Sequence, residues 1–207
     1  MAAPGFWDLF EEKRARRGRI LIRPQQPAER LFWLDEGWVR LFFAGRRDKE
    51  HTLDIVEPGH PFGELSLKKF RRYVPAYGFF AEALTPVRYR VAPAKPARDV
   101  LKKDEAAARE VAQKLAARLK KAEVRLKALR YDDVPKRLYA LLYALMVEGE
   151  MGLEVHLSHG ELARVIGSSR ETVTRLLGAL ALEDVLELGY RRVVVQDPER
   201  LYRRFSR

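Results

Sequence analysis

Residues 157–180 read LSHGELARVIGSSRETVTRLLGAL, and this stretch decides the fold expected for the C-terminal part of the chain. It contains the pattern S-x-x-E twice, as Ser158 with Glu161 and as Ser168 with Glu171. In this pattern a serine and a glutamate cap the start of an α-helix reciprocally. The stretch therefore predicts two short helices that follow one another closely.

The second of these helices is expected to carry an exposed polar face. Gly167 lies between the helices, where a left-handed residue would end the first one. The apolar positions that can pack the pair together are Leu162, Val165, Ile166, Val173, Leu176, Leu177 and Leu180. The opposite face of the second helix carries Arg170, Glu171, Thr174 and Arg175. A helix-turn-helix presents such a face to the major groove of DNA.

The segment from Gly167 to Arg175, GSSRETVTR, resembles the recognition motif of the Crp/Fnr family, the cyclic-AMP receptor protein and its relatives. The resemblance extends over nearly the whole chain and implies that Arg170, Glu171 and Arg175 contact base edges. The chemistry agrees, because arginine bonds guanine through two donors and glutamate accepts from the cytosine amino group. The alternative is an ordinary surface helix in which Glu171 only caps Ser168.

Composition excludes several classes of site. The 207 residues are 47% hydrophobic and include no cysteine, which excludes disulfides, thiolate zinc sites and cysteine-ligated iron–sulfur or haem centres. No apolar run approaches the roughly 18 residues that span a bilayer, and no signal peptide opens the chain, so we expect a cytoplasmic protein with no membrane partner. We expect neither an enzyme nor a metal site, because the four histidines lack ligand spacing: His51, His60, His156 and His159.

The net charge of +11 indicates a polyanionic partner. Residues 1–130 contain 29 lysines and arginines against 17 aspartates and glutamates, a balance of +12. Residues 131–207 contain 11 against 12, a balance of −1. Either the second helix is locally basic in a neutral domain, or DNA also runs along the N-terminal domain.

The N-terminal half has the pattern of a small β-structure. A short helix is expected around Phe6, Trp7, Leu9 and Phe10. Alternating apolar runs separated by glycine turns then predict strands at 19–22, 31–34, 38–43, 51–56, 77–84 and 87–91, with turns at 35–37, 45–49 and 57–59. Many short strands at this spacing indicate a β barrel or roll.

This half resembles the cyclic-nucleotide-binding β roll of the family, through Gly18, Gly37, Gly59 and the run Phe62-Gly63-Glu64-Leu65. The resemblance implies an effector pocket at Gly63, Glu64 and Leu65. The glutamate of this run would hold the ribose 2′-hydroxyl of a nucleotide, and backbone amides would hold its phosphate.

The rest of the nucleotide site departs from the family pattern. The arginine and serine that hold the phosphate in nucleotide-binding members are replaced here by Val74 and Pro75. A buried phosphate without a cation is costly, and proline lacks a backbone donor. Arg71 or Arg72 could supply the charge from a shifted position. We favour a roll kept as scaffold, with no cofactor and no cyclic AMP.

A long helix is expected after Asp104, which is placed to cap it. Its small and apolar residues repeat in steps of four and three over three heptads, and we call this set the seam: Ala108, Ala112, Leu115, Leu119, Ala122, Leu126 and Leu129. A stripe this narrow favours a partner helix, and in the family this helix is the dimer axis. The alternative is a single helix packed on its own β roll. Ala122 and Glu123 stand where the family uses hydroxyls to contact adenine.

The remaining segments complete a winged domain. A hinge is expected at 131–135, with Asp133 capping the next helix, then a strand at 153–157 and a final helix around 198–205. Two further runs, 185–188 and 192–195, predict a β hairpin, the wing. Phosphate contacts are expected from Ser158, His159, Ser169 and Thr172, and from Arg191 and Arg192 unless these two form only a solvated turn.

These observations predict an α+β protein with three parts: a cyclic-nucleotide-binding-like β roll at 1–97, a dimerisation helix at 98–131 and a winged helix-turn-helix at 132–207. The resemblance implies a homodimeric transcription regulator that binds an inverted-repeat operator. Its expected partners are double-stranded DNA, a second copy of the chain and RNA polymerase. The alternative is the same architecture switched by an atypical small ligand in the roll.

Overall fold

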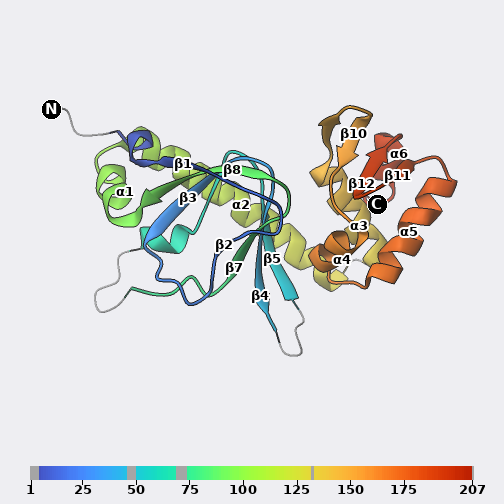
Figure 1. Cartoon of the computed structure of the whole chain (residues 1–207), viewed down its shortest axis with the longest axis horizontal. Coiled ribbons are helices and arrows are strands. Elements are labelled where there is room, and N and C mark those ends of the chain that lie inside the picture. The colour runs from blue at the N-terminus through green and yellow to red at the C-terminus, as the bar shows by residue number, and fades with distance from the viewer. Residues whose placement is uncertain (1–4, 46–49, 69–73, 132, 207) are drawn as a thin grey trace. The chain divides into compact units, whose positions relative to one another are not determined.

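The computed structural model describes residues 5–45, 50–68, 74–131 and 133–206 (Figure 1). The chain divides into two compact units, an N-terminal unit Met1–Ala122 and a C-terminal unit Glu123–Arg207. Both combine helices with antiparallel strands, which confirms the α+β class.

The N-terminal unit is a β roll of two four-stranded antiparallel sheets, with strand orders β1-β8-β3-β6 and β2-β7-β4-β5 (Figure 1). The strands are β1 Glu11–Ala15, β2 Ile20–Ile22, β3 Arg30–Glu36, β4 Val39–Ala44, β5 Glu50–Val56, β6 His60–Phe62, β7 Phe80–Ala83 and β8 Val87–Pro93. Its core is built by alternating residues of both sheets, including Ile22, Leu34, Val39, Leu41, Val56, Phe62, Ala81 and Ala83. The roll is therefore confirmed.

Two strands of this unit, β1 and β6, were missing from the sequence prediction. β1 has the charged sequence EEKRA without apolar alternation, yet all five of its residues pair with β8. β6 has only three residues, one of them Pro61. Of the turn expected at 45–49, only Gly45 lies inside the described residues.

Short helices cover a second core in the same unit. The 3-10 helix η1 Trp7–Leu9 and the helix α1 Ala94–Leu101 surround Phe6, Leu31, Trp33 and Ala97, all buried. The ring of Trp7 meets that of Trp33 edge-on at 4.7 Å. α1 includes Pro96, because a proline in the first turn of a helix costs no hydrogen bond. A further 3-10 helix, η3, spans Glu64–Leu67.

The helix α2 Glu105–Tyr131 has two distinct faces. Asp104 accepts a hydrogen bond from the Ala107 amide at 2.9 Å, which confirms its capping role. Ala107, Val111 and Arg118 are buried on one face. On the seam, Leu119 and Leu126 are 62% and 71% exposed, while Ala112 is also exposed. The seam residues Ala108, Leu115 and Ala122 are half-buried, and the side chain of Leu129 lies outside the described part.

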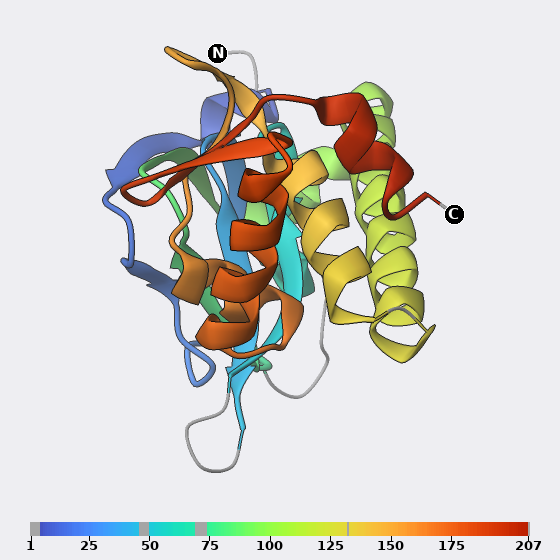
Figure 2. The same cartoon turned by 90° about the vertical axis from the view of Figure 1, so that its right-hand side faces the viewer.

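The C-terminal unit is a winged helix-turn-helix. Its helices are α3 Val134–Leu145, α4 His159–Ile166, α5 Arg170–Leu182 and α6 Pro198–Arg203. Its strands β9 Val147–Gly149, β10 Gly152–Val155, β11 Leu186–Gly189 and β12 Arg192–Val195 form one antiparallel sheet in the order β11-β12-β10-β9. Figure 2 shows α3, α4 and α5 grouped together. Asp133 caps α3 as expected, accepting from the Lys136 amide at 3.0 Å.

Candidate nucleic-acid interface

The turn between α4 and α5 is fixed by local hydrogen bonds. Ser158 and Glu161 form a complete capping box at the start of α4. Gly167 ends that helix in the left-handed conformation, with φ of 68°. The Ser168 amide then donates to the Ala163 carbonyl at 3.0 Å, so Ser168 completes the end of α4.

The predicted cap of α5 was wrong by one residue. Ser169 caps the helix, since its Oγ accepts from the Thr172 amide at 3.1 Å. Either of the two adjacent serines could have been the N-cap of α5 by sequence. Ser168 instead belongs to the end of α4, because its amide closes the preceding turn. The second S-x-x-E match, Ser168 with Glu171, is therefore not a capping box.

The two faces of α5 follow the predicted pattern. Val173, Leu176, Leu177 and Leu180 are buried. Arg170, Glu171, Thr174 and Arg175 are exposed, and we call this set the reading face. Four polar side chains thus stand on the first two turns of a helix whose other side is anchored in the core. A reading helix inserted in the major groove needs this arrangement.

The carboxyl group of Glu171 is held in its ionised form. Its pKa is lowered by hydrogen bonding to its own backbone amide and to the Ser169 hydroxyl. A carboxylate near a helix N-terminus is also favoured by the helix dipole. Glu171 is therefore a pure acceptor, which suits the exocyclic amino group of cytosine.

His159 connects the start of α4 to the reading face. Its Nδ1 lies 2.9 Å from Oγ1 of Thr174. Partial burial, and then the charge of Arg170, lower the pKa of His159. Close by, the hydroxyls of Ser169 and Thr172 lie 3.1 Å apart at the start of α5. Ser158 differs from these, because its hydroxyl and its amide both donate to Glu161 Oε2 at 2.7 Å.

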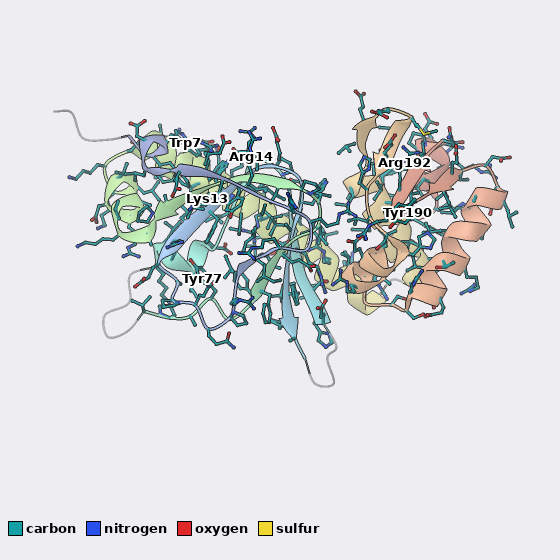
Figure 3. The ribbon with its side chains drawn as sticks, viewed as in Figure 1. Trp7, Lys13, Arg14, Tyr77, Tyr190 and Arg192 are labelled. Carbon is teal, nitrogen blue, oxygen red and sulfur yellow. The ribbon has the colours of Figure 1, made fainter. Side chains whose placement is uncertain are left out.

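The wing consists of β11, β12 and the connecting residues Tyr190 and Arg191. Tyr190 is 93% exposed, and Figure 3 labels it with Arg192 on this hairpin. Arg192 Nη1 lies 4.0 Å from Oε1 of the buried Glu154. The guanidinium of Arg191 donates to Glu161 Oε1 at 2.6 Å.

The candidate effector pocket in the N-terminal unit begins with a glycine that no other residue can replace. Gly63 has φ of 74°, and an added Cβ would lie 2.9 Å from Cδ2 of Phe32. The close approach of Phe32 and the left-handed backbone both require glycine here. Gly63 thereby sets the direction of Glu64, the first residue of η3, while Leu65 packs against the roll core.

A buried arginine from α2 donates hydrogen bonds to the carboxylates of this candidate pocket. Arg118 Nη1 lies 3.2 Å from Glu64 Oε2 and also donates to the Pro61 carbonyl. Its Nε and Nη2 donate to Oδ2 of the buried Asp54 at 3.0 and 2.9 Å. Burial alone would lower the pKa of Arg118, but the carboxylates of Glu64 and Asp54 raise it overall. Arg118 therefore remains charged and ties α2 to the roll.

Val74 and Pro75, at the positions where the resemblance implies the phosphate ligands, have no charged side chain, but basic residues line the same surface pocket: Lys68, Lys95, Arg98 and Lys102. Val74 is exposed, and Pro75 uses its carbonyl to accept from the Ala28 amide at 2.8 Å. Arg71 and Arg72, which could have replaced the missing charge, lie outside the described residues. Within the described ranges no cluster of three or more histidine, aspartate or glutamate side chains could hold a metal, and no helix has the length and apolar character for crossing a membrane.

Comparison with known families accounts for both units. Residues 12–104 match the cyclic nucleotide-binding domain, and residues 136–204 match the Crp-like helix-turn-helix domain. The chain belongs to the Crp/Fnr family. It is accordingly a transcription regulator with a DNA-binding helix-turn-helix.

Individual Crp/Fnr relatives are similar over almost the full chain. The transcriptional regulator SdrP of Thermus thermophilus is 33% identical, covering 87% of this chain and 87% of that protein. The cyclic AMP receptor protein of the same species is 30% identical, covering 91% of this chain and 85% of that protein. A solved CRP-family transcriptional regulator of T. thermophilus has a TM-score of 0.80 at 28% identity, covering 94% and 97% of the two chains.

Three buried charges of this Crp/Fnr protein have distant partners that only the structure reveals. Asp54, Arg118 and Glu161 are buried charges whose partners lie far away in the sequence. Arg118 immediately precedes Leu119 of the seam. A buried arginine needs a carboxylate partner, and the sequence alone shows neither the burial of Arg118 nor which acid lies beside it.

Proposed function

We propose that the protein is a sequence-specific regulator that acts as a homodimer on an inverted-repeat operator and needs no cyclic nucleotide. The observation that carries the proposal is the reading face, four exposed polar residues on a capped and anchored α5. In this proposal Arg170, Glu171 and Arg175 read bases, and His159, Ser169, Thr172 and Arg192 contact phosphates. We leave Ser158 out, because Glu161 takes both of its donors.

Dimerisation through the seam is supported by the two faces of α2. Ala107, Val111 and Arg118 bind the helix to its own unit. Leu119 and Leu126 stand on a different face and are largely exposed in the single chain. Burying a leucine is worth about 1.5–3 kcal/mol, so pairing two seams would stabilise a dimer by several leucine contacts. A single helix packed only on its own roll would leave this face without a role.

Independence from cyclic nucleotides is supported by the pocket. Arg118 already pairs with both Glu64 and Asp54, so these two carboxylates have a cationic partner within the chain. The side chains of Val74 and Pro75 supply no cation for a phosphate, and Pro75 has no amide to donate. We propose that residues 1–97 form a scaffold, followed by the dimer helix and the winged domain. In this proposal RNA polymerase is a further partner, and the protein has no catalytic activity.

A second candidate function is a sensor with the same architecture and an atypical ligand. Glu64 keeps 38% of its side chain exposed despite the contact with Arg118, which leaves a carboxylate accessible in the pocket. One relative is named a cyclic AMP receptor protein. This candidate predicts that operator binding by the purified protein is weak until a small molecule is added.

The test is selection of binding sites from a pool of random duplex DNA by the purified full-length protein, without any added effector. The proposal predicts enrichment of an inverted repeat whose half-sites are about one helical turn apart, about 34 Å. Enrichment only in the presence of cell extract would favour the sensor. Failure to enrich any repeat under either condition would contradict operator recognition.

A further inference from the structure

The wing contains a strained arginine. Arg191 has φ of 53°, in the left-handed region, at the turn where β11 reverses into β12. Glycine and asparagine are the residues that turns favour at such positions, and other residues adopt this conformation at a cost of about 1–2 kcal/mol. A strained residue persists when surrounding contacts hold it, so its side chain is expected to have a structural task.

That contact is an ion pair with a buried glutamate of α4. Arg191 Nη2 lies 2.6 Å from Glu161 Oε1, and the side chain of Glu161 is only 8% exposed. The other oxygen, Oε2, accepts from the amide and the hydroxyl of Ser158 in the capping box. Both oxygens of one buried carboxylate are thus committed, one to the start of α4 and one to the wing.

We infer that Arg191 is a positioning residue that fixes the wing against the helix-turn-helix through Glu161, and that it is not a phosphate ligand. This inference rests on the proposed DNA-binding function and revises the expectation from sequence. Removing the guanidinium would take away the cation that Glu161 Oε1 contacts in the wing, and breaking a buried ion pair by removing one partner is unfavourable. The pair therefore couples the direction of the wing to the cap of α4, whose N-terminal His159 contacts the reading face through Thr174.

The two possible roles of Arg191, phosphate ligand and positioning residue, predict different effects of removing Glu161 on operator affinity. If Arg191 binds phosphate, loss of Glu161 would free the guanidinium, and operator affinity would stay equal or rise. If Arg191 positions the wing, loss of Glu161 and loss of Arg191 would have the same effect, and the double variant would lose no more than either single variant. Residues in one ion pair show this non-additivity.

The experiment uses the full-length protein with Glu161→Gln, Arg191→Asn and the double variant. Glutamine retains the capping box but removes the charge. Asparagine tolerates the left-handed turn but is too short to span the pair. The control is Arg203→Asn, which removes an arginine from the exposed pair with Glu199 on α6. Two quantities are measured: amide hydrogen exchange of residues 186–195 without DNA, and operator affinity as a function of salt.

The inference predicts that the wing amides exchange faster than in the wild type in all three variants. In the control their exchange rate should equal that of the wild type. The inference also predicts a loss of operator affinity of about 3- to 100-fold in each variant, with no further loss in the double variant. The slope of log affinity against log salt should not change. Unchanged wing exchange, additive losses, or a slope reduced by about 0.9 in Arg191→Asn alone would overturn it. If the wild type binds no DNA, the proposed function fails, while the exchange data still decide the role of the pair.

Discussion

Arg118 Nη1 lies 3.2 Å from Oε2 of Glu64, so the residue that the family resemblance assigns to a nucleotide is bonded to the long helix α2. The same guanidinium holds Asp54 with two further hydrogen bonds. Arg118 is followed by Leu119 of the seam, so this contact fixes how α2 is rotated on the roll. The N-terminal unit thereby sets the orientation of Leu119 through a contact within the chain.

Cyclic AMP at millimolar concentration should leave both the melting temperature and the operator affinity unchanged. A ligand at 100 times its dissociation constant would add about 2.7 kcal/mol to the free energy of unfolding, which a thermal melt detects readily. The cyclic AMP receptor protein of T. thermophilus, a relative of this chain, serves as the positive control. A clear upward shift in the melting temperature would show that the pocket has a phosphate-binding cation after all.

If the proposed dimer forms through the seam, Leu119→Lys should make the protein monomeric and abolish tight operator binding. Two lysines would meet across the seam without partners, whereas the single chain exposes this position and should fold normally. Light scattering gives the mass, and circular dichroism confirms the fold. Leu182→Lys is the matched control, because Leu182 is 90% exposed and lies outside the seam. A Leu119→Lys protein that remains dimeric would exclude the seam as the interface.

Stability and operator affinity should respond to acid in opposite directions. The pKa values of His60 and His159 are lowered, in both cases mainly by burial. Their folded-state values lie below the unfolded value near 6.5, so the folded chain binds fewer protons. Their contribution to stability is therefore present above about pH 6.5 and lost as the pH falls, by at most about 1.4 kcal/mol per pH unit for each histidine.

Operator affinity should instead rise between pH 7.5 and 6, because a DNA phosphate near His159 favours the protonated ring. Thermal melts and fluorescence anisotropy measure the two trends on the same samples. In His159→Gln the affinity should no longer depend on pH in this range, while His60→Gln should leave that dependence intact. A pH dependence of affinity that survives His159→Gln would exclude the proposed phosphate contact.

Extended operator DNA should bind more tightly than a short operator at low salt. The +12 balance of residues 1–130 lies outside the helix-turn-helix, and bent flanking DNA could reach these charges. Each added phosphate contact should steepen the plot of log affinity against log salt by about 0.9. Titrations of both duplexes from 50 to about 200 mM salt measure the slopes. Equal slopes would assign the basic half to another role.

The sequence was sufficient to predict which side chains are buried where the periodicity of a single helix or strand determines it. On α5 the 3.6-residue period separates Val173 and Leu176 from Arg170 and Arg175, and the structure follows it. The seam of α2 is also periodic, but Leu119 and Leu126 are exposed in the single chain, and its role as a dimer interface stays a prediction. Charged β1 escaped prediction because its pairing with β8, and not its own alternation, makes it a strand.

Contacts between distant elements could not be predicted from these patterns. Arg118 bonds Glu64 across 54 residues, and Arg191 bonds Glu161 across 30. A periodic pattern tells which face of an element is buried, but it does not tell which side chain of another element lies there. The predicted capping residue of α5 was wrong for a smaller reason. Only the backbone hydrogen bond from the Ser168 amide to the Ala163 carbonyl distinguishes the two neighbouring serines.

The most direct measurement is the affinity of wild type, Arg170→Ala and Arg175→Ala for the selected operator and for random duplex DNA, without any effector. If the reading face carries specificity, each variant should lose about 1–3 kcal/mol at the operator and little at random DNA. Arg203→Ala, an exposed arginine on α6, should lose little at both. Equal losses at operator and random DNA in Arg170→Ala and Arg175→Ala would contradict base reading by α5.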